Sequence, residues 1–317
     1  DLDGTEQKKK LGSNAILAVS MAACKLSSIE KNISLFKYLG GEKANLLPVP
    51  LMNVINGGKH ANNLLRIQEF MIRPEKSKTF SHALEICFLV IQKLRSELSK
   101  KNFSLALGDE GGFAPDINFN EEAIKLINSA IKKAGFEPGI DVSVCLDVAS
   151  NELYKNGKYS VKDHKFLTAY DTHKYYKGLI KKYFIKSIED PFHEDEWNNW
   201  SIFTKKNDIQ IVGDDLFATN NKRLKKGIKS FAANAILIKP NQIGTVSETM
   251  EVIKTAHENG FKTIISHRSG DSEDTFIADL AVATNSSQIK TGSLARSERV
   301  AKYNRLLRIE DELGNLA

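Results

Sequence analysis

Six polar residues each close an apolar run along the chain, and their side chains could carry out chemistry together. They are Asp147, Glu189, Asp214, Lys239, His267 and Lys290. Four of the five intervals between them span 23 to 28 residues, close to the roughly 30 residues of one strand–helix unit. The carboxyl ends of the strands of a (β/α)8 barrel converge on one mouth, so these residues are predicted to meet there. Three carboxylates, two lysines and a histidine at one mouth indicate a metal-assisted enzyme that forms a carbanion.

The three carboxylates are the candidate metal ligands. Asp147, Glu189 and Asp214 offer hard oxygen atoms without clustered cysteines or histidines, which favours Mg²⁺ or Mn²⁺ over zinc. One carboxylate at a strand end is commonly just the cap of the next helix, so the prediction depends on three such residues in successive units. Asp190 and Asp215 alternate with them and are predicted to point the other way, as supporting or capping groups.

The two lysines are candidates for proton transfer and charge balance. Lys239 follows the apolar run AILI. Beside a metal and a second ammonium group, it is predicted to lose part of its affinity for the proton and to act as a general base. The alternative is a simple ion pair with the carboxylates. Lys290 occupies the equivalent place two units later, which favours the catalytic interpretation and indicates balanced charge around a bound dianion.

Two glycine-rich segments could bring further groups to the mouth. Glu110 lies in the segment GDEGG, whose glycines permit a tight turn and a close approach to a ligand. It is a candidate general acid, with an ordinary acidic turn as the alternative. His60 ends the similar segment NGGKH, and Glu69 lies in an apolar strand-like run, where a charge is costly unless it is paired.

A serine next to a histidine, Ser266 before His267, could suggest a serine hydrolase. Neighbouring residues on a strand point to opposite faces, so these two cannot pair as nucleophile and base. The G-x-S-x-G motif is also missing from the sequence. Arg268 and Ser269, a guanidinium fork and a hydroxyl followed by Gly270, suit a phosphate group better.

The elements that must position these residues alternate between strands and helices. Strands are predicted at 50–56, 67–72, 142–148, 184–189, 209–213, 235–239, 262–266 and 287–290, and helices at 13–30 with Ser13 as N-cap, 78–100, 120–135, 246–258 and 296–313. The order ββαα(βα)6 predicts an α/β fold with a mostly parallel, TIM-like barrel. The polar segment 150–175 is predicted to be a long loop over the mouth.

The composition narrows the class of protein. A chain of 317 residues, 41% of them hydrophobic, is long enough for a barrel of about 250 residues and a small extra unit. Three unclustered cysteines argue against a disulfide framework and for a reducing cytoplasm. There is no long apolar run and no secretory segment, so no membrane partner is predicted. The net charge of +6 is spread in lysine pairs, which argues against nucleic acid and suits an anionic substrate.

A series of motifs resembles the enolase family. They are DGTEQKKKLGSNAILAVS at 3–20, PVPLMNVINGGKHANN at 48–63, IQEFMIRP at 67–74, LGDEGGFAP at 107–115, CLDVAS at 145–150, SIEDPF at 187–192, VGDDLFATN at 212–220, IKPNQIGT at 238–245, ISHRSGDSEDTFIADL at 265–280 and IKTGSLARSERVAKYNRLLRIEDELG at 289–314. Because these motifs cover essentially the whole chain in order, chance does not explain the resemblance.

The resemblance implies the reversible dehydration of 2-phosphoglycerate to phosphoenolpyruvate, a glycolytic step. It implies that Asp147, Glu189 and Asp214 hold the first Mg²⁺. Lys239 would remove the C2 proton and Lys290 would stabilise the ene-diolate together with Mg²⁺, as is general for the enolase superfamily. Further implied roles are Glu110 as the acid for the C3 hydroxyl with help from Glu69 and His60, a phosphate site at Arg268 and Ser269 beside His267, and substrate contacts from His60, Glu69, Glu189, Asp214 and Lys290.

Against the family pattern, residues 1–45 resemble the last helices of a truncated N-terminal domain, and residues 46–317 resemble the barrel. A mobile loop whose serine helps to hold a second Mg²⁺ is missing, so an incomplete second site and low activity are expected of the chain as written. The family's homodimer or higher oligomer also uses the N-terminal domain. The resemblance therefore does not predict an oligomer for this chain. Pro240, where the family has another apolar residue, is predicted to keep Lys239 extended.

Two alternatives stay open at this point. Another member of the superfamily, such as a sugar-acid dehydratase or a racemase, would carry a lysine base on the second strand, where this chain has Glu69. A catalytically impaired fragment that binds RNA or a protein surface through its positive charge is the second alternative. Steeply salt-dependent binding to RNA would favour it, whereas the scattered lysines argue against it.

Overall fold

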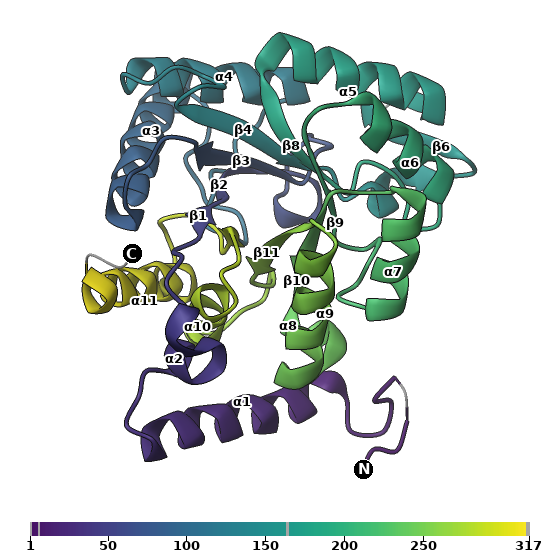
Figure 1. Cartoon of the computed structure of the whole chain (residues 1–317). Coiled ribbons are helices and arrows are strands. Elements are labelled where there is room, and N and C mark those ends of the chain that lie inside the picture. Colours follow the sequence, from purple (N-terminus) through teal and green to yellow (C-terminus); the bar gives the residue numbers. More distant parts are fainter. Residues whose placement is uncertain (1, 6, 163–164, 315–317) are drawn as a thin grey trace.

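The computed structural model describes residues 2–5, 7–162 and 165–314. Its main sheet has the strand order β1-β12-β11-β10-β9-β8-β4-β3-β2, and helices surround this sheet (Figure 1). The strands are β1 (Val49–Pro50), β2 (Met52–Asn56), β3 (Glu69–Pro74), β4 (Val142–Asp147), β8 (Ile185–Glu189), β9 (Gln210–Gly213), β10 (Ala235–Ile238), β11 (Lys262–Ser266) and β12 (Gln288–Lys290). This topology confirms the predicted α/β barrel.

The helices follow the predicted order as well. They are α1 (Ser13–Glu30), α2 (Leu35–Gly40), α3 (Phe80–Lys100), α4 (Asn120–Lys133), α5 (Ala169–Tyr183), α6 (Trp197–Lys206), α7 (Asn221–Ser230), α8 (Pro240–Ile243), α9 (Val246–Glu258), α10 (Phe276–Ala283) and α11 (Ser297–Leu313). After α1, α2 and the two-residue β1, the strands β2 and β3 and the helices α3 and α4 precede six strand–helix units, as the ββαα(βα)6 pattern requires.

One run of chain closes the barrel. β1 pairs in parallel with β12, β2 pairs antiparallel with β3, and only Leu51 lies between β1 and β2. This run therefore joins the two ends of the sheet. β3 is also antiparallel to β4, with Glu69 opposite Asp147, while the other neighbouring pairs are parallel. The start of β3 consequently lies at the mouth where the parallel strands end.

Apolar side chains fill the barrel and the layer around it. An inner cluster contains Leu51, Met71, Cys145, Val212, Ala235, Leu237 and Ile264, and a larger cluster packs between the sheet and the helices. The parallel strands are covered on both faces, which is why they read as continuous apolar runs in the sequence. Among the described residues, we find no helix with the length and apolar character needed to cross a membrane.

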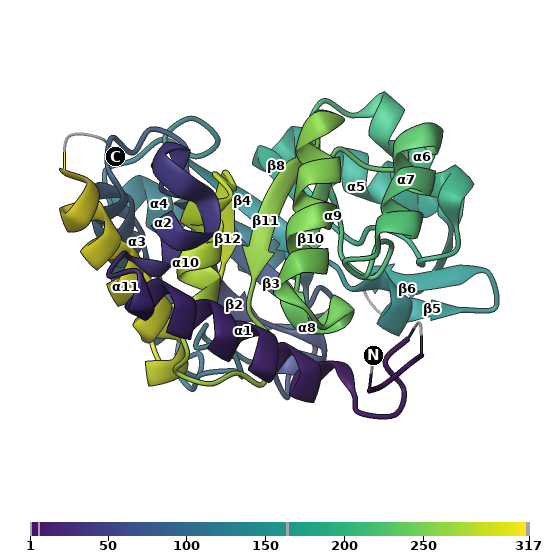
Figure 2. The same ribbon diagram turned by 60° about the horizontal axis from the view of Figure 1, so that its bottom comes forward.

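The first two helices lie outside the ring (Figure 2). α1 contacts α2, α8 and α9, and α2 packs against α10. The prediction that Ser13 caps α1 was wrong by one residue, because Gly12 occupies the N-cap position with φ 81° and no side-chain cap bond. Positive φ is easy for glycine and strained for serine. On α1, Leu17 is buried, whereas Val19 and Ile29 are 72% and 73% exposed.

The segment 150–175 is not a loop, contrary to the prediction. It contains the antiparallel sheet β5 (Tyr154–Lys155), β6 (Lys158–Lys162) and β7 (Lys165–Thr168), followed by the start of α5; residues 163–164 lie outside the described part. Asn156 and Gly157 have φ values of 51° and 76°, as the tight turn of a hairpin requires. Tyr159 and Val161 are buried. Lysines flank this short buried run at Lys155, Lys158 and Lys162, so it did not resemble a strand in the sequence.

Gly40 permits a close approach between α2 and α10. A Cβ atom at this position would lie 2.0 Å from the carbonyl oxygen of Ala283. We expect Gly40→Ala to lower the free energy of unfolding by about 1–3 kcal/mol in urea denaturation, because backbone atoms would have to move. Gly178→Ala in α5 is the control, since nothing lies within 4 Å of a Cβ there, and it is expected to stabilise by about 0.5–1 kcal/mol. Equal effects of the two changes would contradict the close packing.

Candidate active site at the barrel mouth

The structure brings the candidate residues together at the carboxyl-end mouth of the barrel. A cavity of about 180 Å³ at this mouth is lined by every candidate except Glu189, which is 1% exposed and bonds to Lys290. The residues that end or directly follow strands are Asp147 on β4, Glu189 on β8, Asp214 after β9, Lys239 after β10, His267 after β11 and Lys290 on β12. Residues that are spaced by one strand–helix unit in the sequence therefore lie close together at the mouth.

Lys290 lies among three carboxylates. Its Nζ is 2.9 Å from Asp147 Oδ2, 2.9 Å from Glu189 Oε1 and 3.2 Å from Glu69 Oε2. Burial opposes the charge of this ammonium group, but the surrounding carboxylates raise the pKa of Lys290 well above its ordinary value. Lys290 in turn lowers the pKa of Asp147 against the cost of burial. The centre of the site therefore holds a permanent cation.

Lys239 is held by an ion pair. Its Nζ lies 2.5 Å from Asp214 Oδ2. Burial disfavours its charge, yet the carboxylates of Asp214 and Glu189 raise the pKa of Lys239 above its ordinary value. The expectation of a weakened proton affinity was thus wrong, because the two carboxylates outweigh burial and the charge of Lys290. The expectation for Pro240 is confirmed, because this proline opens α8 and Lys239 is extended, with φ −121° and ψ 101°.

The carboxylates fit a divalent cation. Glu189 Oε2 is buried and has no hydrogen-bond partner among the described residues. Burial and the nearby charge of Asp147 raise the pKa of Glu189 well above its ordinary value. An unpaired buried carboxylate oxygen facing other carboxylates is a poor arrangement for a protein alone and a good one for a metal. Together with Asp214, these hard oxygen donors suit Mg²⁺.

Asp190 supports the backbone that carries Asp214. Its two carboxylate oxygens accept the backbone N–H groups of Asp214 at 2.9 Å and of Asp215 at 2.8 Å. This is the supporting role that was predicted, but the predicted orientation was wrong, because Asp190 and Asp215 line the cavity at the mouth. Possible ligand atoms of the three aspartates also lie within 4.8 Å of one another. Because Asp190 is already engaged with two backbone N–H groups, we assign it to fixing the backbone that presents Asp214.

Glu69, Glu110 and His60 form the wall at the start of β3. His60 Nδ1 lies 3.6 Å from one carboxylate oxygen of each glutamate. Burial and the charge of Glu110 raise the pKa of Glu69 well above its ordinary value. Against the cost of burial, His267 and Lys290 hold the pKa of Glu110 well below its ordinary value. A proton shared by the two glutamates therefore resides on Glu69 in this state.

Arg268 and Ser269 lie at the rim of the cavity. Both are exposed, and Arg268 Nη1 donates to Asn241 Oδ1 at 2.7 Å. His267, directly before them, is 3% exposed and its Nε2 lies 3.2 Å from Glu110 Oε1. The loop therefore presents one buried imidazole to the acid group and two polar side chains to whatever anion enters the mouth.

Sequence reasoning missed two residues that contact the site. Asn53 is buried in β2 and its Nδ2 donates to Glu110 Oε2 at 3.0 Å. An asparagine inside an apolar strand is costly unless it is paired, and that was the available signal. Arg299 in α11 contacts His267. A basic residue in a helix with many charged residues gives no comparable signal.

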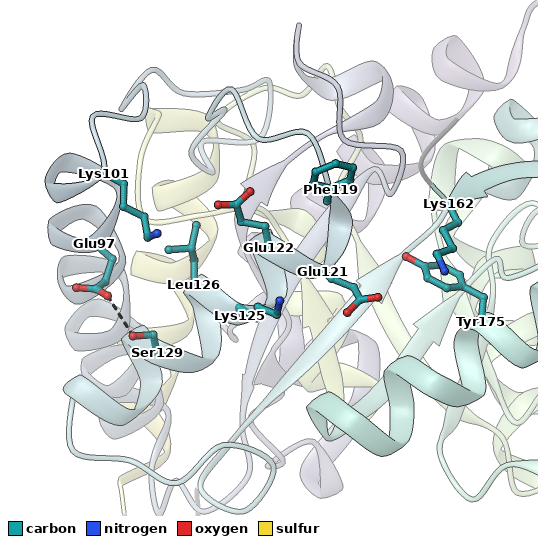
Figure 3. A pocket seen from close by; sticks show the side chains of 10 residues that line it. All are labelled: Glu97, Lys101, Phe119, Glu121, Glu122, Lys125, Leu126, Ser129, Lys162 and Tyr175. Carbon is teal, nitrogen blue, oxygen red and sulfur yellow. Dashed lines mark hydrogen bonds between the residues drawn. The ribbon is translucent and has the colours of Figure 1, made fainter. Parts of the chain in front are cut away.

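A larger hollow lies away from this mouth. It measures about 570 Å³ and lies beside α3, α4 and α5, and Figure 3 shows its acidic and basic side chains side by side. Glu97 there accepts from Ser129 at 3.1 Å and pairs with Lys133 at 2.5 Å. Since charges of both signs are distributed around this groove and no set of groups converges, size alone does not make it the reactive site.

Comparisons with known proteins agree with this geometry. Residues 44–317 match the family model described as "Enolase, C-terminal TIM barrel domain", and residues 1–39 match the one described as "Enolase, N-terminal domain". A protein of Pelagibacter ubique (strain HTCC1062) named "Enolase" is 64% identical over 318 residues. This similarity covers 100% of the present chain and 76% of the relative.

Proposed function

The chain belongs to the enolase family, and from this premise we propose which side chains carry each part of its reaction. The enzyme is a carbon–oxygen lyase of glycolysis that interconverts 2-phosphoglycerate and phosphoenolpyruvate. The forward reaction breaks the C2–H and C3–O bonds, forms the C2=C3 double bond and releases water. It needs a base for the C2 proton and an acid for the departing hydroxyl.

The observation that supports this function best is the placement of base and acid on opposite walls. Going round the barrel, β10 with Lys239 stands opposite β3 with Glu69. Glu110 and His60 lie beside Glu69. A substrate between these walls would lose its C2 proton to the amine of Lys239 and its hydroxyl toward Glu110. Groups on the two sides of one small cavity are what an elimination requires.

Lys290 is assigned to the negative charge that develops as the proton leaves. Its ammonium group is buried and permanently charged, so it faces the substrate without reorganisation. The proton held by Glu69 would pass through His60 to Glu110, and Glu110 would then give it to the departing hydroxyl. Arg268 and Ser269, with His267 beside them, are assigned to the phosphate group, which suits a guanidinium fork and a hydroxyl.

Mg²⁺ is assigned to Asp147, Glu189 and Asp214. When bound, it supplies a Lewis acid for the substrate carboxylate and neutralises the charge that raises the pKa of Lys239. Cytoplasm, where the other glycolytic intermediates are found, is the proposed location. Neither the site nor the comparisons favour the alternative of an RNA-binding fragment.

The function is tested by the absorbance of phosphoenolpyruvate formed from 2-phosphoglycerate in the presence of Mg²⁺. Steady formation that stops when the metal is chelated would support the proposal. A protein that is folded, binds Mg²⁺ and yet forms no phosphoenolpyruvate would contradict it for this chain.

Metal binding gives a separate prediction. At about 100 times its dissociation constant, Mg²⁺ is expected to stabilise the native protein by about 2.7 kcal/mol, which raises the melting temperature by roughly 5 °C for a chain of this size. Glu189→Gln is expected to lose most of this shift in differential scanning fluorimetry. Asp208→Asn, an exposed carboxylate ahead of β9, is the matched control and should keep it. The same shift in both variants would remove Glu189 from the metal site.

A further inference from the structure

Arg299 is a buried arginine for which the reaction so far gives no role. It belongs to the first turn of α11, and 1% of its surface is exposed. Its two terminal nitrogens make four hydrogen bonds. Nη1 lies 2.6 Å from His267 Nδ1 and 2.7 Å from the carbonyl oxygen of Arg268, and Nη2 donates to the carbonyl oxygens of Ser269 at 2.6 Å and Asp109 at 3.2 Å.

These bonds connect two loops of the mouth. One loop carries His267, Arg268 and Ser269 after β11, and the other carries Glu110 directly after Asp109. The packing behind them is close as well, because a Cβ atom at Gly292 would lie 2.7 Å from the carbonyl oxygen of Glu110 and 2.8 Å from Arg299 Cδ. The guanidinium therefore fixes the position of the acid loop relative to the phosphate loop.

The bond to His267 also decides where the imidazole carries its proton. A guanidinium group has donors and no acceptor. Nδ1 of His267, 2.6 Å from Nη1, must therefore accept, so the single proton of the neutral ring is on Nε2. That atom lies 3.2 Å from Glu110 Oε1. The ring thus carries its N–H group beside the carboxylate that is assigned to the leaving hydroxyl.

The charges around the ring are consistent with a neutral imidazole. Burial lowers the pKa of His267, and the cations Arg299 and Lys290 lower it further, whereas Glu110 raises it. The net result is a pKa below the ordinary value. A second proton on Nδ1 would face the guanidinium at hydrogen-bond distance, which is the least favourable place for it.

We propose that Arg299 is a positioning residue of the active site: it holds His267 in the tautomer that directs Nε2–H to Glu110 and locks the Glu110 loop to the Arg268–Ser269 loop. Its neighbour one turn later, Lys302, connects α11 to the same segment after β11. Lys302 is 1% exposed, and its Nζ bonds to the carbonyl oxygens of Glu298 at 2.6 Å and of Ser272. The kinetic part of this inference rests on the proposed function, whereas the tautomer does not.

The tautomer can be measured in the unmodified protein. The chain has 7 histidines, and with ¹⁵N-labelled histidine the ring nitrogens of His267 are assigned by the signals lost in His267→Asn. We expect a protonated Nε2 and an unprotonated Nδ1 for this ring near neutral pH. The opposite tautomer, or a charged ring, would overturn the proposal even if the protein had no enolase activity.

The kinetic test compares Arg299→Met, Arg299→Lys and Arg305→Met. Removing the guanidinium should lower kcat by about 100-fold, since misplacement of a reacting group by about 1 Å has an effect of that size. Arg299→Lys should fall between Arg299→Met and the native enzyme, because lysine keeps the charge and loses the fork. Arg305 lies on the same helix, bonds to Asp279 at 2.5 and 2.8 Å, and serves as the control that changes stability but not kcat.

The pH profile separates positioning from a general loss of structure. Without the cation the pKa of His267 rises, and a charged ring would keep Glu110 ionised. The acid limb of kcat should therefore move to higher pH in Arg299→Met and stay in place in Arg305→Met. Native kcat and an unchanged profile in folded Arg299→Met would overturn the proposal. If that variant does not fold, the labelled histidine of the native protein still decides the tautomer.

Discussion

Lys239→Ala is expected to lower kcat for phosphoenolpyruvate formation by about 10³- to 10⁴-fold. The amine is the one basic group assigned to the C2 proton, and removal of a general base has effects of this order. The Asp214 partner at 2.5 Å would lose its counter-charge, but Mg²⁺ can take its place. The effect should therefore appear in kcat at saturating Mg²⁺, measured by absorbance of the product.

A matched lysine distinguishes this loss from a loss of net charge. Lys262 begins β11 at the opposite end of the barrel and is exposed. Lys262→Ala should keep the native kcat. Exchange of the C2 hydrogen with solvent deuterium gives a second readout, because it reports proton removal alone. Exchange at the native rate in Lys239→Ala would show that another group is the base.

Lys290→Met is expected to lower the free energy of unfolding of the metal-free protein by about 3–5 kcal/mol at neutral pH. The reason is that the ammonium group contacts three buried carboxylates, Asp147, Glu189 and Glu69. Methionine fills a similar volume, so packing is mostly retained. What is lost is the cation that makes burial of those carboxylates tolerable. Urea denaturation in the presence of a chelator measures this loss.

The pH dependence of the loss has a definite sign. Without Lys290, the pKa values of the three carboxylates rise in the native state above their values in the unfolded chain. Near neutral pH the native variant then binds more protons than the unfolded variant, so its stability falls as pH rises. The deficit should be largest at neutral pH and shrink toward acid pH, and saturating Mg²⁺ should recover part of it. Lys186→Met, an exposed lysine of β8, is the control. A deficit that is constant across pH would contradict the charge explanation.

The sequence predicted much of this molecule because each strand end left a local signal. Asp147 and Glu189 close runs that are buried on both faces, and such runs are easy to recognise as strands of a parallel barrel. The regular distance to the next run then indicated strand–helix units. Since barrel topology brings strand ends together, residue types at those ends were enough to predict which side chains share the mouth.

Other features depend on contacts that local patterns do not record. The antiparallel direction of β3, which brings Glu69 to the mouth, is set by pairing with β2 and β4. The small sheet within 150–175 was hidden by the lysines that flank its short buried run. Arg299 acts through carbonyl groups of loops that are distant in sequence. None of these three facts follows from the spacing of residue types.

The pKa of Lys239 shows a different limit. The sequence indicated that a metal and Lys290 would weaken its hold on the proton, but the carboxylates of Asp214 and Glu189 raise the pKa of this amine. Which neighbouring charge has the larger effect on this amine depends on the groups that surround it. The position of a residue on a strand does not reveal those groups.

The closure of the barrel by β1 has a consequence for biosynthesis. β1 (Val49–Pro50) is made well before its partner β12 (Gln288–Lys290), because the two strands lie far apart in the sequence. At the usual 5–20 residues per second, a ribosome needs roughly 10–50 s to travel between them. During that time the nascent chain carries an unpaired strand edge, which is the kind of surface that invites aggregation. The barrel can close only after β12 has left the ribosome, so newly made chains depend on protection until that strand emerges.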